Sequence, residues 1–266
     1  MYNRIHNNIM CNKYVELLTH WIYNDIIIIK PDFDKDINLI QFNNKITSLV
    51  FTDYNKLKYA VKNINDSKYY NKKYKLLSKF NNSIDNLPPY ILNLNFSLCF
   101  NQEVNNLPQN LQNLTFGNCF NQLVDNLPQN MHNLTFGSGF NQSVDNLPQN
   151  LQNLTFGYHF NKLVNNLPQT LLNITFGVKF NQLLDDLPNS IISINFKHLI
   201  NNLNYNFNKQ LCCLPNSIIS INLPINYDQE IKHIPLNLKN ISCSSSYKYI
   251  DELKKNENMI TIDFIY

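Results

Sequence analysis

A phrase of twenty residues recurs along this chain without a change in spacing, and this period constrains the fold more than any other feature. The pair Phe-Asn returns every twenty residues from Phe80 to Phe180, and the pair Leu-Pro returns with the same step from Leu87 to Leu187. After an insertion the period resumes in weaker copies that extend to Pro235. A fixed period of this length predicts a solenoid, in which each repeat forms one coil.

Each unit predicts one strand followed by an irregular return. The alternation that places Leu114 and Phe116 on one side of the chain is typical of a strand. Gly117 then predicts a turn. The return contains Phe120, and it ends at Pro128, which disfavours a helix interior. One strand and one return make one coil, and parallel coils favour a right-handed connection.

A coil of twenty residues buries too little apolar surface to fold alone, so the units are expected to stack. Stacking predicts one parallel sheet over residues 80–196, with strands about 4.8 Å apart. It also predicts two inner columns of side chains. One column contains Leu111, Met131, Leu151 and Leu171, and the other contains Phe120, Phe140 and Phe160.

Asparagine makes up 50 of the 266 residues, and two interpretations of this excess are open. One is codon bias in an AT-rich genome. The other applies to the asparagine after each repeated phenylalanine, which lies between apolar positions, where an unpaired buried amide costs about 1–3 kcal/mol. We therefore predict a structural ladder in which these side chains bond the backbone of their own and the adjacent coil, with an exposed turn as the alternative. The ladder comprises Asn81, Asn101, Asn121, Asn141, Asn161 and Asn181.

Charge and cysteine usage bound the partners and the compartment. The chain has a net charge of +3, and eight lysines with interleaved tyrosines fall between Tyr54 and Lys79. This segment is either a solvated connector or a phosphate- or membrane-binding patch. No nucleic-acid motif accompanies it, and we expect neither a nucleic-acid nor a membrane partner. The short apolar run Ile26–Ile29 fits no signal or membrane segment, which predicts a cytoplasmic protein.

The six cysteines lack zinc-ligand spacing with the histidines, so no metal site is expected. Cys99 and Cys119 occupy equivalent places in successive units, which leaves open unbonded thiols or a disulfide.

Catalysis is not expected. Asp125, Asp145 and Asp185 recur at one position of the repeat, so they are part of the period and do not form a convergent acid and base. The histidines fall in different units, and no glycine-rich phosphate loop is present. We predict no enzyme and no cofactor.

A binding surface is the remaining expectation. If Leu114 and Phe116 face inward, their neighbours face outward and form a neutral polar face. The positions that differ between units lie near this face, with Tyr158 as the expected anchor of a partner. The candidate partner-binding residues are Asn113, Thr115, His132, Asn133, Thr135, Asn153, Thr155, Tyr158, His159, Asn173 and Thr175.

The phrases "FNQLVDNLP" and "NLTFG" resemble the FNIP repeat family, a relative of leucine-rich repeats found in social amoebae and in giant viruses of amoebae. The resemblance is strong over residues 80–196 and weak as far as Cys243. It implies an α/β-type repeat protein that is mostly β, a leucine-rich-repeat-like right-handed solenoid with small caps. If the chain is viral, its location would be the host cytoplasm. The family's proline after Phe-Asn-Gln is replaced here by Glu103, Leu123, Ser143, Leu163 and Leu183, so the local turn is not implied.

Family members often carry an N-terminal F-box, with the repeats as the substrate-binding arm of a ubiquitin ligase. Here the spacing of Tyr14, Leu17, Leu18, Trp21 and Ile22 predicts a short helix, either a diverged F-box or a cap of the first coil. We divide the chain into residues 1–45 (cap or small helical segment), 46–79 (divergent first coil and basic connector), 80–196 (six regular repeats), 197–246 (degenerate repeats) and 247–266 (C-terminal cap with a helix and a strand).

Two functions follow as hypotheses. The first is a non-catalytic protein-interaction scaffold, related in its finer form to F-box adaptors and binding a protein of unknown identity as a monomer or with weak self-association. The second is a structural or self-associating rod without a specific ligand.

Overall fold

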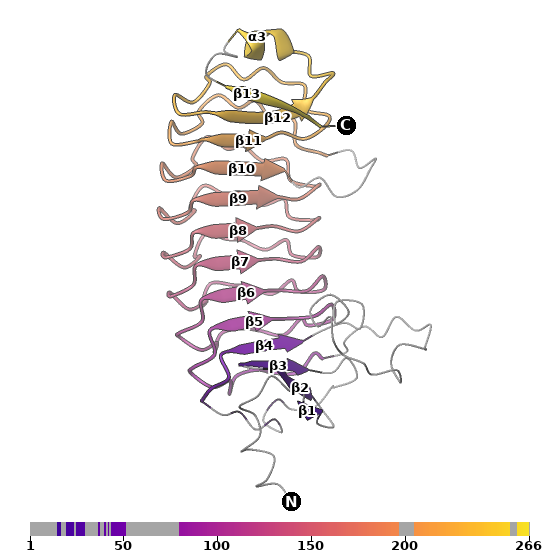
Figure 1. Cartoon of the computed structure of the whole chain (residues 1–266), viewed down its shortest axis with the longest axis vertical. Helices are drawn as coiled ribbons and strands as arrows, with labels where there is room; N and C mark the ends of the chain where they lie inside the picture. The colour runs from indigo at the N-terminus through magenta and orange to yellow at the C-terminus, as the bar shows by residue number, and fades with distance from the viewer. Residues whose placement is uncertain are drawn as a thin grey trace, which may run out of the picture.

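A computed structural model of the chain describes residues 15–16, 20–23, 25–29, 37, 40, 42, 44–51, 80–196, 205–255 and 260–265. Within these residues the protein is a stack of about nine coils that share one sheet (Figure 1). The elements are β1 (Val15–Glu16), β2 (His20–Tyr23), β3 (Ile26–Ile29), β4 (Ser48–Phe51), β5 (Asn93–Asn95), β6 (Asn113–Thr115), β7 (Asn133–Thr135), β8 (Asn153–Thr155), β9 (Asn173–Phe176), β10 (Ser193–Phe196), β11 (Ser220–Asn222), β12 (Asn240–Ser244), α3 (Ile250–Lys254) and β13 (Thr261–Ile265).

The strands of this sheet follow one another in the order of the sequence, from β1 to β13. The pairs from β3 to β13 are parallel, and the regular coils repeat one register, with Leu114 beside Leu134 and Leu134 beside Leu154. This arrangement confirms the parallel solenoid predicted from the period. The sequence of coils needs no long crossover helix, because each return segment is itself the connection.

The N-terminal segment differs from the prediction. The predicted helix is wrong at Trp21 and Ile22, which lie in β2, and β2 pairs antiparallel with both β1 and β3. The other residues of that prediction, Tyr14, Leu17 and Leu18, lie outside the described residues. The strand β3 then pairs parallel with β4, which continues the sheet into the first coil. The basic segment between Tyr54 and Lys79 lies outside the described residues.

The core consists of columns that run through the coils. Leu111, Met131, Leu151 and Leu171 are all fully buried, as predicted. Phenylalanines form two further columns, one at the ends of the strands and one at the starts of the returns. In each regular coil the two rings stack in a nearly parallel pair, with centroids 3.6 Å apart in Phe116–Phe120 and 3.7 Å apart in Phe136–Phe140. Such pairs contribute about 0.5–1.5 kcal/mol beyond the burial of their area.

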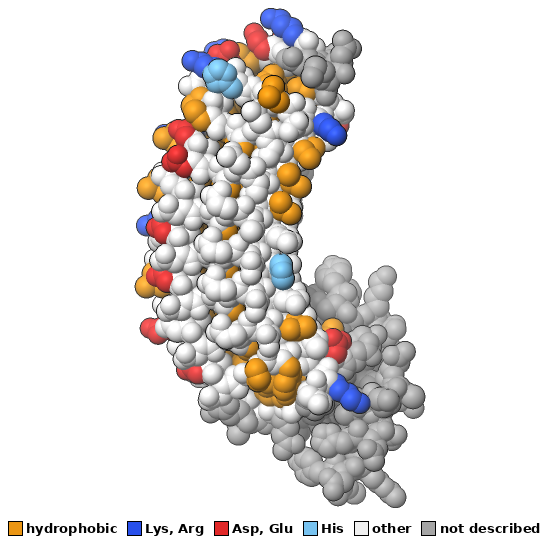
Figure 2. Space-filling view, turned by 90° about the vertical axis from the view of Figure 1, so that its left-hand side faces the viewer, with side chains coloured by type: hydrophobic (Ala, Val, Ile, Leu, Met, Phe, Trp, Pro, Cys, Tyr) orange, Lys and Arg blue, Asp and Glu red, His pale blue; other side chains and the backbone are white. Residues whose placement is uncertain are grey.

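The solenoid is curved, and acidic side chains follow its convex side (Figure 2). Asp85, Asp125 and Asp145 lie on the return segments, so the returns form the convex side and the sheet lines the concave side. The ring columns agree with this curvature. Centroids in the return column are 6.1 Å apart between Phe120 and Phe140, against 5.6 Å in the strand column between Phe116 and Phe136.

Glycine is required after each strand for a reason other than the turn predicted from the sequence. A Cβ atom on Gly137 would lie 2.1 Å from the carbonyl oxygen of Gly117, and one on Gly157 would lie 1.9 Å from that of Gly137. Neighbouring coils approach so closely at this column that no side chain fits. Close backbone contact, rather than a special backbone angle, therefore selects glycine here.

The C-terminal coils keep the fold after the insertion. Ser193 pairs with Ser220, an offset of 27 residues, and the step of twenty resumes where Ser220 pairs with Asn240. Tyr227 and Tyr247 extend the phenylalanine column, and their hydroxyls donate to the carbonyl oxygens of Lys209 and Gln229. Burial raises the pKa of both tyrosines.

The predicted C-terminal helix and strand are confirmed as α3 and β13, which pairs parallel with β12. None of the helices in the described part of the chain has the length and hydrophobicity needed to cross a membrane.

Candidate functional site

The asparagine after each repeated phenylalanine forms the predicted ladder. The Oδ1 atom of Asn121 accepts the backbone N–H of Asn141 at 2.8 Å, and Oδ1 of Asn141 accepts the N–H of Asn161 at 2.9 Å. The same bond recurs from Asn81 to Asn181 and reaches Asn208 beyond the insertion. These side chains are only half buried or exposed, so the ladder is paired, as predicted, but not enclosed in the core.

Replacing Asn141 with Ala should lower the free energy of unfolding by about 1 kcal/mol, because the backbone N–H of Asn161 loses its acceptor and water offsets only part of the loss. The midpoint of urea denaturation measures this change. Gln152→Ala, at an exposed position outside this ladder, is the matched control. Equal midpoints for Asn141→Ala and the wild type would contradict a stabilising ladder.

A second ladder lies on the exposed face of the sheet, and the sequence analysis missed it. Nδ2 of Asn113 donates to Oδ1 of Asn93 at 2.5 Å, Asn133 donates to Asn113, and the pattern continues through Asn153 to Asn173 at 2.6 and 2.7 Å. The asparagines proposed as partner contacts on this face therefore already bind one another. Their half-buried amides hold adjacent coils together. The threonines beside them are also half buried and complete a uniform polar face.

A third ladder joins the return segments. Nδ2 of Asn146 donates to Asp125 at 3.2 Å, and that of Asn166 donates to Asp145 at 3.1 Å. Hydrogen bonds from Ser83 and Asn106 lower the pKa of Asp85 in the same column. The acids in register are thus parts of the stack, in agreement with their periodic placement.

The turns after the strands carry the side chains that differ from coil to coil. Their backbones form a continuous hydrogen-bonded column, in which His159 N–H donates to Ser138 at 2.9 Å and Lys179 N–H donates to Tyr158 at 2.9 Å. We call the pairs 98–99, 118–119, 138–139, 158–159 and 178–179 the turn column. A regular backbone here presents irregular side chains, which is the arrangement that recognition of one partner requires.

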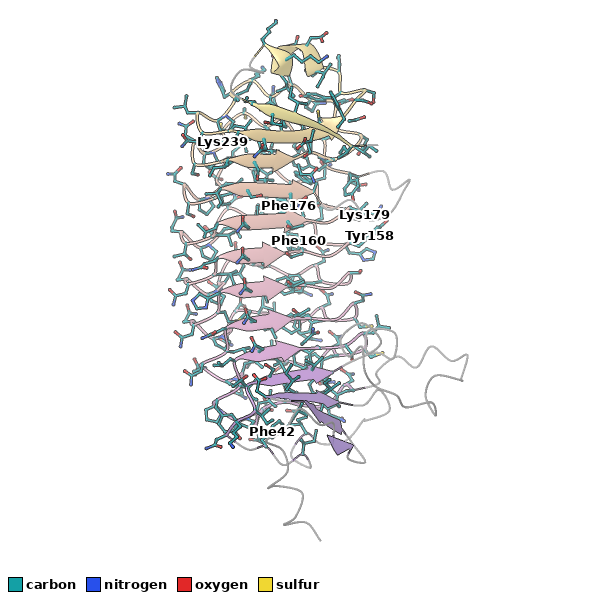
Figure 3. The ribbon with its side chains drawn as sticks, in the orientation of Figure 1. Phe42, Tyr158, Phe160, Phe176, Lys179 and Lys239 are labelled. Carbon is teal, nitrogen blue, oxygen red and sulfur yellow. The ribbon has the colours of Figure 1, made fainter. Side chains whose placement is uncertain are left out.

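Three of these side chains meet in one cluster. Figure 3 shows Tyr158 and Lys179 beyond the carboxyl ends of the strands. The Lys179 ammonium lies 5.7 Å from the centre of the Tyr158 ring. The ring of His159 packs edge-on against the ring of Tyr158, with the two centroids 4.8 Å apart. The Nδ1 atom of His159 lies 2.8 Å from the carbonyl oxygen of Ser138. The cluster combines an aromatic face, a cation and an imidazole on a rigid support.

The remaining predicted residues do not join this cluster. His132 lies in the column that precedes the strands, where its N–H bonds Gln112, at the opposite end of the strand from the turn column. Cys99 and Cys119 lie in the turn column, and they form no disulfide. Leu123 and Leu163, which replace the proline expected from the family, are exposed on the returns.

One group of side chains escaped the sequence analysis because its members are far apart in the sequence. The carboxylate of Asp185 and the thiols of Cys212 and Cys213 lie together on neighbouring returns. The adjacency of the two cysteines was visible, but their partner was not. Asp185 lies in the preceding coil, across the insertion of seven extra residues.

A stack of parallel coils with a concave sheet and short returns is a leucine-rich-repeat-like solenoid. Residues 100–139 and 140–179 match the model of the FNIP repeat, so the chain carries FNIP repeats.

Among solved structures the chain is similar to CroV588 of a giant virus, described as "a novel circular LRR protein structure". The two share 27% identity with a TM-score of 0.58, and the match covers 86% of this chain. The chain spans 38% of the length of that relative. No curated protein matches the chain.

Proposed function

We propose that this protein is a non-catalytic scaffold that binds a protein partner through its turn column, with Tyr158, His159 and Lys179 at the centre of the contact. The observation that carries the proposal is that each coil contains both constant and variable positions. Buried and ladder positions repeat almost unchanged, whereas the turn column carries Asn-Cys, Ser-Gly, Tyr-His and Val-Lys in successive coils. Aromatic and cationic side chains on a rigid backbone are the usual anchors of an interface.

The uniform sheet face is less suited to recognise one partner. Its asparagine amides already donate to and accept from each other, so only part of their hydrogen-bonding capacity remains for a partner. If the protein is related to F-box adaptors, the helical F-box module should precede the first coil. The described residues there form strands. A cytoplasmic location is part of the proposal, and the absence of disulfides among the described cysteines supports it.

A photo-crosslinking amino acid at position 158 tests the contact, with the same group at the exposed convex position 163 as the control. In extracts of the native host, we expect one protein to crosslink from position 158 and not from 163. In affinity purification of chains without the crosslinking group, Tyr158→Ala together with Lys179→Glu should reduce recovery of the same protein at least about tenfold, because hot-spot truncations each cost about 2 kcal/mol or more. Recovery that is unchanged by both substitutions would refute the turn column as the binding surface.

The second candidate function is that of a self-associating rod. The similarity to CroV588, which is described as circular, is consistent with a structural role. Analytical ultracentrifugation over a range of protein concentrations separates the two. Assembly of the pure protein, unaffected by substitutions at Tyr158 and Lys179, would support the rod.

A further inference from the structure

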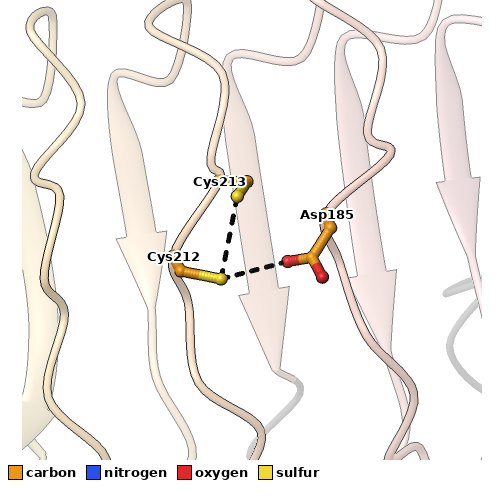
Figure 4. A group of neighbouring side chains, drawn as sticks. All are labelled: Asp185, Cys212 and Cys213. Atoms are coloured by element: carbon orange, nitrogen blue, oxygen red, sulfur yellow. Dashed lines mark hydrogen bonds between the residues drawn. The ribbon is translucent and has the colours of Figure 1, made fainter.

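The third ladder, which joins asparagines and aspartates on the return segments, has different side chains at one place, between the last regular coil and the coil after the insertion. Cys212 and Cys213 occupy there the positions that Asp185 and Asp186 occupy in the preceding coil, as the 27-residue offset of β10 and β11 requires. In the earlier coils an asparagine donates to the acid of the coil before it. Here Cys213 replaces that asparagine, and Asp185 instead accepts the S–H of Cys212 at 3.4 Å (Figure 4).

The two thiols lie close together although they belong to consecutive residues. The chain bends at Cys213, and its Sγ lies 3.7 Å from the Sγ of Cys212. In a straight strand, consecutive side chains point to opposite faces and would separate the two sulfurs. The irregular return therefore creates a pair of thiols with a carboxylate beside it, partly open to solvent.

The separations match the edges of a tetrahedral zinc site. With bonds of about 2.3 Å to sulfur and about 2.0 Å to oxygen, two sulfurs on one zinc ion lie about 3.8 Å apart, and sulfur and oxygen about 3.5 Å apart. The observed values are 3.7 Å and 3.4 Å. The third separation, between Cys213 Sγ and the carboxylate, is within 4.8 Å, and rotation of these surface side chains can shorten it.

We propose that Asp185, Cys212 and Cys213 bind a thiophilic divalent cation of the zinc type, with the fourth position open to water or to a further ligand. Two thiolates and one carboxylate carry three negative charges, which suit a soft or borderline dication and disfavour Mg²⁺ or Ca²⁺. In the next coil, at an offset of twenty residues, Lys232 and His233 stand in register with the two cysteines. His233 does not belong to the group whose ligand atoms lie within 4.8 Å of one another, so the three ligands are those of Asp185, Cys212 and Cys213.

Metal binding at this site has to displace the thiol protons. Hydrogen bonding with Cys213, and secondarily with Asp185, raises the pKa of Cys212, because neighbouring groups disfavour the thiolate. A bound dication reverses this balance, and its binding releases the thiol protons. Burial also raises the pKa of Cys243, to about 11, but that thiol lies in the core away from any such partner set.

Titration of the reduced full-length chain with Co²⁺ tests the site, since thiolate ligation of Co²⁺ produces a charge-transfer absorption in the near ultraviolet. We expect one Co²⁺ per chain and displacement of Co²⁺ by Zn²⁺, which binds such ligands more tightly. Cys212→Ser and Cys213→Ser should each abolish the charge-transfer band. Asp185→Asn should weaken Co²⁺ binding at least about tenfold while leaving the band visible at saturation.

Two substitutions serve as matched controls, and circular dichroism of every variant confirms the fold. Cys119→Ser removes an exposed thiol from the turn column, and Asp145→Asn changes the equivalent acid of a coil without cysteines. Neither should change Co²⁺ affinity or the absorption. A reduced, folded wild type without a thiolate–Co²⁺ band would overturn the proposal, as would a loss of the band in Cys119→Ser equal to that in Cys212→Ser.

Discussion

Deleting one whole period, residues 140–159, should leave a shorter folded solenoid, whereas deleting half of it, residues 140–149, should unfold or aggregate the chain. The whole-period deletion joins Gly139 to Phe160, which then takes the place of Phe140 in the return column. Every ladder bond finds an equivalent partner, since Asn161 meets Asn121 as Asn141 did. In a repeat array, stability is a sum over units and nearest-neighbour interfaces, so one coil fewer costs one such increment.

The half-period deletion removes the return and leaves the strand. It takes away four buried side chains, Phe140, Val144, Leu147 and Pro148, and with them the path that leads back to the next strand. The cores of the two neighbouring coils then face solvent. Circular dichroism and thermal melting check the outcome, with deletion of residues 120–139 as a second whole-period control. Similar loss of structure in the whole- and half-period deletions would contradict the solenoid.

Phe140→Ala should lower the free energy of unfolding by about 3–5 kcal/mol, the cost of truncating a buried phenylalanine. The Phe140 ring is fully buried. It stacks on Phe136 at 3.7 Å within its coil and lies 6.1 Å from both Phe120 and Phe160 in the adjacent coils. The cavity therefore breaks contacts in three coils, and the rigid backbone column beside it limits collapse.

The midpoint of urea denaturation, followed by far-ultraviolet circular dichroism, checks this prediction. Leu163→Ala is the matched control, because its side chain is 57% exposed and should change stability by no more than about 0.5 kcal/mol. A cost for Phe140→Ala as small as that of Leu163→Ala would show that the ring column does not hold the coils together.

Much of the fold was predictable because its determinants are local and repeated. The alternation of Leu114 and Phe116 defines a buried strand face within three residues, and Pro128 excludes a helix from the return. A strict step of twenty then leaves only stacking as a way to bury these faces. The columns of Leu111 and Phe120 follow directly, and the structure confirms them.

The candidate site was predictable only in part. Tyr158 and His159 stood out because they break the period, but their contact with Lys179 depends on how two coils lie against each other. The same holds for the glycine column, where a carbonyl of the preceding coil excludes a Cβ atom. Spacing within one unit carries no information on these distances between coils.

The sequence by itself thus determined the solenoid, its period and its inner columns, since each depends on alternation and turn chemistry within a single unit. Only the tertiary structure decided that the strand asparagines bind one another, that Trp21 and Ile22 lie in a strand rather than a helix, and that Asp185 meets Cys212. The first and third are side-chain contacts between coils, which form across offsets of 20 and 27 residues. The second depends on the antiparallel pairing of β2 with β3, which outweighs a weak helical spacing.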